Sequence, residues 1–198
     1  MLQHGIHKRY WACRFDVLDT CGIPGDMVPH YVEAKEYADN FERYYRKGIG
    51  MLLKGPVGTM KTTLAVAVLQ EVIRKTGGGY FVAMAGLMDK LMMMWRGYRI
   101  EEMQRFERRI RNTPLLVIDD LGAEYEHEVT IAKIDAIISE RYDRQLPIII
   151  TTNLANNGIM GRYQARVYDR LKGTSLVITC KGESQRKEPK KQEDKYGK

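Results

Sequence analysis

The sequence has no apolar run near the ~18 residues that a membrane-spanning helix needs, and its N-terminus has no hydrophobic stretch before a small-residue cleavage site. These absences predict a protein that neither crosses a membrane nor is secreted, and we expect it in the cytoplasm. Cysteine is also scarce. Cys13, Cys21 and Cys180 form no C-x-x-C pair and no cluster with histidine, so we expect reduced, buried thiols and no zinc site.

Internal repeats and long linkers are absent as well. The 198 residues are 44% apolar and 29% charged, which is enough for one globular domain with its own core. Acidic residues are in the minority, since 32 Lys and Arg stand against 25 Asp and Glu, and the formal net charge is +7. A basic protein can bind a polyanion such as nucleic acid, but net charge alone does not require one.

The excess positive charge lies in two places. Between positions 96 and 111, six arginines stand against three glutamates, and residues 181–198 hold seven Lys or Arg against four Asp or Glu. The second stretch has almost no apolar residues after Gly182, which is typical of a solvated segment. We therefore predict an irregular lead-in over residues 1–30, a folded core over 31–182 and a basic, flexible tail over 183–198.

Strands and helices are predicted to alternate along the core. Expected strands lie at 49–55, 80–84, 115–119, 147–152 and 175–180, and expected helices at 32–47, 61–75, 86–112, 128–145 and 163–171. The strands are continuously apolar, which is typical of a parallel sheet covered on both faces. The sequence thus predicts an α/β fold. Because such sheets bind ligands at the carboxyl ends of their strands, residues just after each strand are the functional candidates.

A phosphate-binding loop is predicted at the end of the first strand. The segment GPVGTMKTT resembles G-x-x-x-x-G-K-[ST], with Met60 where a second glycine is usual. In such loops backbone N–H groups surround the phosphates, the lysine reaches the outer phosphates and the hydroxyl binds Mg²⁺. The predicted nucleotide-binding residues are Gly55, Pro56, Val57, Gly58, Thr59, Met60, Lys61, Thr62 and Thr63.

The methionine leaves the nucleotide affinity of this loop open. At a negative φ angle, methionine at position 60 would add little backbone strain, whereas a positive φ would destabilise the fold by ~1–2 kcal/mol. The side chain would also lie near the phosphates. A glycine-containing turn without a ligand is the alternative for the loop taken alone.

Polar residues follow the next strands. LLVIDDLG ends a buried strand in two carboxylates, and we expect Asp119 to hold Mg²⁺ and Asp120 to polarise the attacking water. After PIIITTN, the amide of Asn153 could orient that water, although NLANNG is also a turn-rich stretch. Together with the lysine-bearing loop, these residues predict phosphoryl-transfer chemistry.

Three arginines are candidates for the cation that would neutralise the charge of the γ-phosphate. Arg166 and Arg170 are four apart on one predicted helix and so share a face from which they could reach a neighbouring subunit. Arg186 follows the last predicted strand and could act within its own subunit. Helix-surface arginines that only contact solvent are the alternative.

These segments together resemble one family. GPVGTMKTTLA, LLVIDDLGAE, IITTN, RVYDRL and SQR occur in the order and spacing of the AAA+ ATPases of the bacterial helicase-loader group, DnaC and DnaI, and of their transposon relative IstB. The resemblance covers residues 5–187. It implies a P-loop NTPase of the AAA+ initiator clade that uses ATP and Mg²⁺, with a three-layer sandwich, a five-stranded parallel sheet and a reduced or absent helical lid.

The resemblance also implies residue roles. Walker A would run from Gly55 to Thr62 and Walker B would be Asp119 and Asp120, while sensor 1 would be Asn153. The arginine finger would be Arg170 with Arg166 assisting, and sensor 2 would be Arg186. This clade carries an insertion that touches single-stranded DNA between its second and third strands. The DNA-contact candidates are therefore Arg96, Arg99, Arg105, Arg108 and Arg109, with a solvated helix face as the alternative for each.

The implied function is that of an ATP-hydrolysing loader of a replicative helicase, which contacts single-stranded DNA and forms homo-oligomers through its arginine fingers. A transposition helper that binds duplex DNA and a transposase is the nearer alternative. A non-hydrolysing DNA-binding adaptor with a degenerate P-loop is the second. The sequence departs from the family at Met60. The loaders' separate N-terminal partner-binding domain is also missing here, either because it was removed or because this is a minimal form that docks differently, so the partner stays open.

Overall fold

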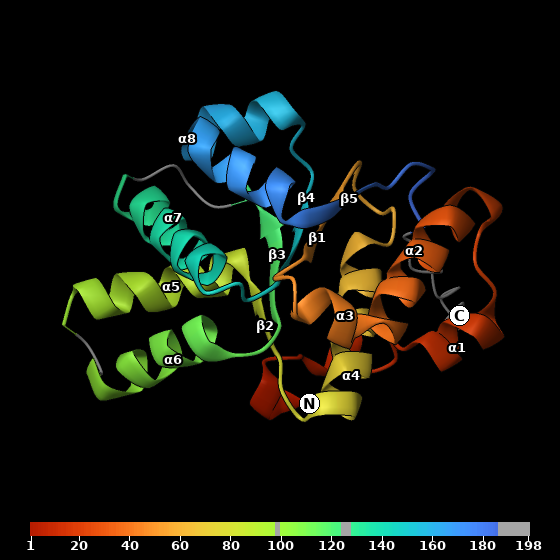
Figure 1. Ribbon diagram of the computed structural model, residues 1–198, viewed down its shortest axis with the longest axis horizontal. Coiled ribbons are helices and arrows are strands. Elements are labelled where there is room, and N and C mark those ends of the chain that lie inside the picture. The colour runs from red at the N-terminus through yellow and green to blue at the C-terminus, as the bar shows by residue number, and fades with distance from the viewer. Residues whose placement is uncertain (98–99, 124–127, 186–198) are drawn as a thin grey trace, which may run out of the picture.

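A computed structural model describes residues 1–97, 100–123 and 128–185 of the chain (Figure 1). Its strands form one five-stranded parallel sheet in the order β2-β3-β4-β1-β5. Their bounds are β1 Gly50–Lys54, β2 Tyr80–Ala83, β3 Leu116–Leu121, β4 Ile148–Thr152 and β5 Ser175–Thr179. The predicted α/β fold with a parallel sheet is confirmed. The order of the strands brings the carboxyl ends of β1, β3 and β4 next to one another.

Helices cover both faces of the sheet, which makes the fold a three-layer sandwich (Figure 1). One face carries α1 Phe15–Cys21, α2 Val28–Asp39, α3 Phe41–Tyr45 and α4 Lys61–Thr76. The other face carries α5 Met84–Trp95, α6 Ile100–Asn112, α7 Glu128–Asp143 and α8 Asn156–Gly173. Short 3-10 helices occur at η1 Leu2–His4, η2 Lys8–Tyr10 and η3 Gly25–Met27.

Neighbouring residues of each strand belong to two different cores. In β1, Met51 and Leu53 pack in the core formed with α2 and α4, while Leu52 packs in the core formed with α5 to α8. The three side chains are at most 1% exposed. A strand buried on both faces has no position for an exposed polar residue, which explains the continuous apolar runs in the sequence.

The carboxyl end of β3 departs from regular pairing. The register between β3 and β4 shifts between Ile118 and Leu121, and Asp120 takes a left-handed conformation with φ of 58°. The Asp120 N–H donates to the side-chain hydroxyl of Thr151 at 2.9 Å. This irregularity turns the second carboxylate of the acidic pair away from the strand.

Several predicted helix boundaries differ from the structure. The helix expected over 32–47 is two helices, α2 and α3. The expected helix at 163–171 begins earlier, in α8, which is interrupted at Gln164 by φ 68° and ψ 153°. The lead-in over 1–30 contains α1 and the three 3-10 helices rather than irregular chain alone.

The prediction of buried thiols is correct for Cys180 and wrong for Cys21. Cys180 is fully buried, Cys13 is half-buried and Cys21 is exposed, and all three are free. Burial raises the pKa of the Cys180 thiol to about 11, so this group stays protonated at neutral pH.

Candidate functional site

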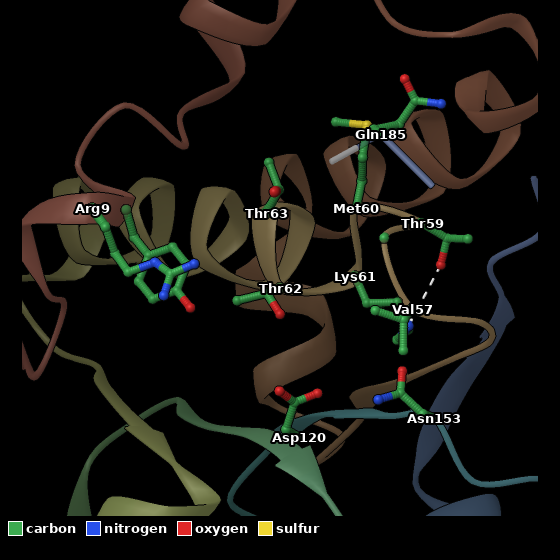
Figure 2. Close-up of a pocket in the computed structure, with 12 residues that line it drawn as sticks. Arg9, Val57, Thr59, Met60, Lys61, Thr62, Thr63, Asp120, Asn153 and Gln185 are labelled. Atoms are coloured by element: carbon green, nitrogen blue, oxygen red, sulfur yellow. Dashed lines mark hydrogen bonds between the residues drawn. The ribbon is translucent and has the colours of Figure 1, made fainter. Parts of the chain in front are cut away.

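Of the residues predicted to bind nucleotide, 57–63 line one cavity above the carboxyl edge of the sheet, whereas Gly55 and Pro56 do not line it (Figure 2). Its volume is about 410 Å³. The cavity is lined by Arg9, Tyr10, Val57, Gly58, Thr59, Met60, Lys61, Thr62, Thr63, Asp120, Asn153 and Gln185. Strands β1, β3 and β4 and the N-terminus of α4 thus bring together side chains that are far apart in the sequence.

The glycines of the loop are needed where its backbone turns. Gly55 and Gly58 have φ of 148° and 85°, which side-chain-bearing residues rarely adopt. A Cβ atom on Gly55 would lie 2.0 Å from the carbonyl oxygen of Cys180. The loop therefore passes close to the chain that leaves β5, and no larger residue fits there.

Met60 adopts the left-handed conformation, with φ of 62° and ψ of 9°, immediately before α4. Of the two possibilities left open by the sequence, the costly one applies, at ~1–2 kcal/mol for a residue other than glycine. The methionine side chain lines the cavity beside Gln185 and away from the lysine (Figure 2). It forms part of the wall and does not fill the loop.

The ammonium group of Lys61 lies at the mouth of the loop. Its Nζ donates to the carbonyl oxygens of Gly55 at 2.8 Å and Pro56 at 2.5 Å, and approaches the hydroxyl of Thr59 at 3.5 Å. Lys61 is only 5% exposed yet lines the cavity. A buried cation held on the carbonyls of a phosphate loop is in place to exchange them for phosphate oxygens.

Asp119 and Thr62 form an oxygen pair beside the lysine. The Thr62 hydroxyl donates to Oδ1 of Asp119 at 2.8 Å, and the Thr151 hydroxyl donates to the same oxygen at 2.7 Å. Burial raises the pKa of Asp119 although both hydroxyl groups favour its charged form. Burial thus disfavours the charged form of Asp119, and a cation bound beside the carboxylate would stabilise that form.

The oxygen pair suits Mg²⁺ in particular, because this ion usually binds one or two protein oxygens together with phosphates and water. Within the described ranges, no group of three or more His, Cys, Asp and Glu side chains is arranged to hold a metal. Asp119 and Thr62 would therefore hold an ion that also binds a phosphate ligand.

Asp120 and Asn153 face the cavity from the ends of β3 and β4 (Figure 2). Asp120 is half-buried and Asn153 is exposed. A carboxylate and a neutral amide at the same edge are the two groups that phosphoryl transfer uses to hold an attacking water.

Arg166 and Arg170 do not line the cavity of their own chain. Both pair with Asp135 of α7, and Arg170 also donates to the hydroxyl of Ser139. They share a helix face as predicted, and Arg166 is the more exposed of the two, with 61% of its side chain accessible. Arg186 lies outside the described residues.

The arginine-rich segment, residues 96–111, follows α5 and includes most of α6. Arg96, Arg105 and Arg108 are exposed, whereas Arg99 lies outside the described residues. Arg105 pairs at 3.9 Å with Glu101. Arg109 donates to the carbonyl oxygen of Gln3 at 3.0 Å and lies over the ring of Tyr80, so it also holds the N-terminal segment.

Sequence reasoning missed three residues of the cavity wall, Arg9, Tyr10 and Gln185. Gln185 is placed by its N–H, which donates to the carbonyl oxygen of Gly58 at 3.0 Å. No motif marks any of the three. Their segments flank the predicted core, where the sequence indicated only an irregular lead-in and a solvated tail.

A parallel sheet of this order, with a lysine-bearing loop after β1 and an acidic pair ending β3, defines a P-loop ATPase of the AAA+ class. Within that class, the chain belongs to the family of IstB-like ATP-binding proteins, whose model matches residues 43–193. The predicted resemblance is thereby confirmed, and the family is one of ATPases.

Relatives of two kinds are similar to this chain. A replicative helicase loader DnaC of Buchnera aphidicola subsp. Baizongia pistaciae is 28% identical over 184 residues, which cover 92% of this chain and 73% of the relative. An ATP-binding protein in an insertion sequence of Mycobacterium tuberculosis is 32% identical over 183 residues, which cover 87% of this chain and 66% of the relative.

Among solved structures, the crystal structure of a DnaC helicase loader is similar to the chain with a TM-score of 0.76 and 27% identity. The match covers 88% of this chain and 100% of that one. Within the described residues, none of the helices has the length and apolar character needed to cross a bilayer.

Proposed function

We propose that this chain is an ATP-dependent loader of a replicative DNA helicase, which hydrolyses ATP and contacts single-stranded DNA. The observation that carries the proposal is the meeting of Lys61, Thr62 and Asp120 at one cavity, with the Thr62 hydroxyl donating to the buried Asp119 carboxylate behind it. The similarity to helicase loaders named DnaC supports the choice of partner.

Each cavity residue has a distinct role in this proposal. The backbone N–H groups of the loop and the Lys61 ammonium bind the phosphates of ATP. Mg²⁺, held by Thr62 and Asp119, supplies positive charge to the phosphates when it is bound. Asp120 accepts a hydrogen bond from the attacking water, and Asn153 orients that water without adding charge.

The remaining positive charge comes from arginines outside the cavity. Arg170, with Arg166 beside it, acts on the ATP of a neighbouring subunit, so that the active form is a homo-oligomer. The absence of both residues from the cavity of their own chain supports a role between subunits. Arg186 acts as a sensor within its own subunit.

DNA contact is proposed for the arginine-rich segment. The exposed side chains of Arg96, Arg105 and Arg108, with Arg99, bind the phosphates of single-stranded DNA and give a salt-dependent affinity. Arg109 contributes less, because its guanidinium already holds Gln3. Replacing Arg105 and Arg108 together by glutamine should weaken binding to a single-stranded oligonucleotide and make the salt dependence less steep.

Two substitutions test the nucleotide site. Lys61→Ala should abolish ATP binding, and Lys75→Ala on the same helix, away from the cavity, is the matched control. Asp120→Asn should keep ATP binding but lose hydrolysis, and asparagine tolerates the positive φ of this position. Unchanged nucleotide affinity of the Lys61→Ala protein in calorimetry would show that the loop does not bind phosphate.

A transposition helper is the second candidate, and the similarity to the insertion-sequence protein and to the IstB-like family favours it. Such a protein would bind duplex DNA and a transposase. Affinity capture with ATP present should bring down a replicative helicase under the main proposal and a transposase under this one. A preference for duplex over single-stranded oligonucleotides would also favour the helper.

A non-hydrolysing DNA-binding adaptor is the third candidate, and the strained Met60 is the observation that favours it. In that case the chain would release no phosphate at saturating ATP and Mg²⁺, even with DNA present. Measurable turnover that is lost in Asp120→Asn would exclude an adaptor with a degenerate loop.

A further inference from the structure

The N-terminal segment forms a wall of the nucleotide cavity that no motif predicts. Arg9 and Tyr10, at the end of η2, line the same cavity as Lys61 and Asp120. Figure 2 shows Arg9 on one side of the cavity, across Thr62 from Val57. The site is therefore closed on one side by chain that precedes the ATPase core.

Residues of the core hold this segment in place. The side-chain amide of Gln70 in α4, which is 6% exposed, donates to the carbonyl oxygens of Tyr10 at 3.1 Å and Cys13 at 2.9 Å. The ring of Tyr10 packs against Phe81 of β2, with ring centroids 5.6 Å apart. The position of Tyr10 is thus fixed by β2 and by α4, the helix whose N-terminus forms part of the nucleotide site.

Arg9 is placed by Tyr10 in turn. The guanidinium carbon of Arg9 lies 4.9 Å from the centroid of the Tyr10 ring, which orients the exposed arginine over an aromatic face. Arg9 has no acidic partner among the ion pairs of the described residues. An oriented guanidinium without a carboxylate partner is suited to an anionic ligand.

The acidic edge of the cavity lies close to this pair. Asp120 and Thr62, whose hydroxyl donates to Asp119, line the same cavity as Arg9 and Tyr10, and Figure 2 shows Thr62 between Arg9 and Lys61. Burial and the charges of Asp119 and Asp120 also raise the pKa of Tyr10. These carboxylates mark the side of the cavity where Mg²⁺ and the terminal phosphate of ATP are expected. Arg9 is therefore near the terminal phosphate end of the site.

We propose that Arg9, supported by Tyr10, binds the terminal phosphate of ATP within its own subunit and so makes the site prefer ATP over ADP. The inference rests on the proposed nucleotide site. A guanidinium presents paired donors that match phosphate oxygens, and its planar group can stay stacked on the phenol while it binds. The N-terminal segment then distinguishes the two nucleotides because only ATP carries the γ-phosphate.

The test compares ATP and ADP affinities of full-length variants by titration calorimetry with Mg²⁺. Arg9→Ala should weaken ATP binding at least tenfold and ADP binding less than twofold. Arg9→Lys should give an intermediate loss of ATP affinity. Arg14→Ala is the matched control, because Arg14 is an exposed arginine of the same segment that pairs with Asp16 outside the cavity. It should leave both affinities unchanged.

Equal losses for ATP and ADP would place Arg9 at the base or the inner phosphates and overturn the proposal. Unchanged affinities for both nucleotides would make Arg9 a solvated side chain and overturn it as well. The Lys61→Ala variant separates this inference from the proposed function. If Lys61→Ala binds nucleotide normally, the whole site assignment fails, whereas a normal Arg9→Ala protein leaves that assignment in place.

Discussion

Met60 occupies a backbone conformation that its residue type rarely adopts. With φ of 62°, it precedes a lysine that must stay at the mouth of the loop, so the turn cannot relax without moving Lys61. The strain belongs to the backbone of the loop itself. Its relief is therefore expected to act on stability, while the side chain on the cavity wall acts on affinity.

Met60→Ile and Met60→Gly separate these two effects. Isoleucine keeps the apolar character of methionine, but β-branched residues are outliers at positive φ, so the unfolding free energy should fall by ~1–2 kcal/mol. Glycine adopts this φ freely and should not destabilise the protein in that way. Thermal unfolding without nucleotide measures the difference, and titration of Met60→Gly with ATP should show an altered affinity.

Asp119 gives the site a cost in stability that depends on pH. Burial raises its pKa in the folded protein, so the folded state binds its proton more tightly than the unfolded state. The stability contribution of Asp119 therefore falls as pH rises from its unfolded value through the raised folded value. Above that raised pKa the folded protein holds a buried charge that a cation would stabilise.

Asp119→Asn should consequently raise the melting temperature at neutral pH by a few degrees, the shift that ~1 kcal/mol gives in a chain of this size. The amide oxygen can still accept from Thr62 and Thr151. The gain should disappear at acidic pH, and Mg²⁺ with ATP should no longer stabilise the variant. Asp169→Asn, at an exposed position of α8, is the control and should show neither effect.

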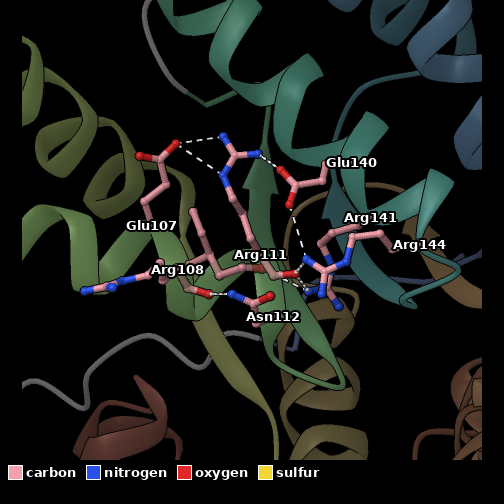
Figure 3. Close-up of polar contacts among 8 residues, drawn as sticks. Glu107, Arg108, Arg111, Asn112, Glu140, Arg141 and Arg144 are labelled. Atoms are coloured by element: carbon pink, nitrogen blue, oxygen red, sulfur yellow. Dashed lines mark hydrogen bonds and ion pairs between the residues drawn. The ribbon is translucent and has the colours of Figure 1, made fainter.

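At the scale of elements, a buried arginine joins α6, α7 and the start of β4 (Figure 3). Arg141 of α7 is 0% exposed and donates to the carbonyl oxygens of Ile110 at 2.9 Å and Pro147 at 2.8 Å. Burial lowers its pKa to about 9, so it stays charged at neutral pH. This contact fixes the end of the arginine-rich helix to the sheet.

Replacing Arg141 by methionine should lower the unfolding free energy by ~2–4 kcal/mol, because buried carbonyl groups lose their donors. Arg144→Ala is the matched control. Its side chain is 44% exposed and pairs with Glu140 at 3.2 Å, so its loss should change stability by less than ~1 kcal/mol. Denaturant unfolding measures both, and equal stability of the two variants would contradict a structural role for the buried arginine.

The sequence predicts the strands well because their residues are buried on both faces, which leaves a continuous apolar pattern. It predicts the ends and breaks of helices and the irregularities of strands poorly, because tertiary contacts decide them. The break at Gln164 and the turn at Asp120 are examples, since the Asp120 N–H takes the hydroxyl of Thr151 in place of a regular strand partner. A hydrogen bond of this kind, between residues far apart in the chain, leaves no periodic pattern in the sequence.

The site residues fall into two groups, those that local motifs predict and those that only long-range contacts place. Lys61, Asp119 and Asn153 follow strands and belong to recognisable motifs, so the sequence predicts their meeting. Arg9 and Tyr10 reach the cavity only because Gln70, 60 residues after Tyr10, holds that segment through hydrogen bonds. A contact of that separation cannot be inferred from one sequence.

At the scale of the whole molecule, Arg166 and Arg170 do not line the cavity of their own chain. Mixing two variants of the subunit therefore tests directly the proposal that these arginines act on a neighbouring subunit. Arg170→Ala leaves the cavity intact but removes the arginine that we propose acts on a neighbouring subunit, whereas Asp120→Asn keeps that arginine and removes the carboxylate proposed to hold the attacking water. Each variant alone should hydrolyse little ATP. A mixture of the two should regain phosphate release, because intact cavities then lie next to intact arginines.

The control for that experiment is a mixture of two preparations of the same variant, which should regain nothing. Asp135 adds a second expectation. It pairs with both arginines in the single chain, so under the proposed role they would leave or share this carboxylate when a neighbouring subunit binds. Asp135→Asn should therefore change how hydrolysis depends on protein concentration.

The cavity takes one wall from Arg9 and Tyr10 and another from Gln185, so the beginning and the end of the described chain converge on the same ligand site. A nucleotide there would connect these two segments to each other. Anything attached to either segment, whether a fused domain or a reporter dye, would consequently experience ATP turnover at close range.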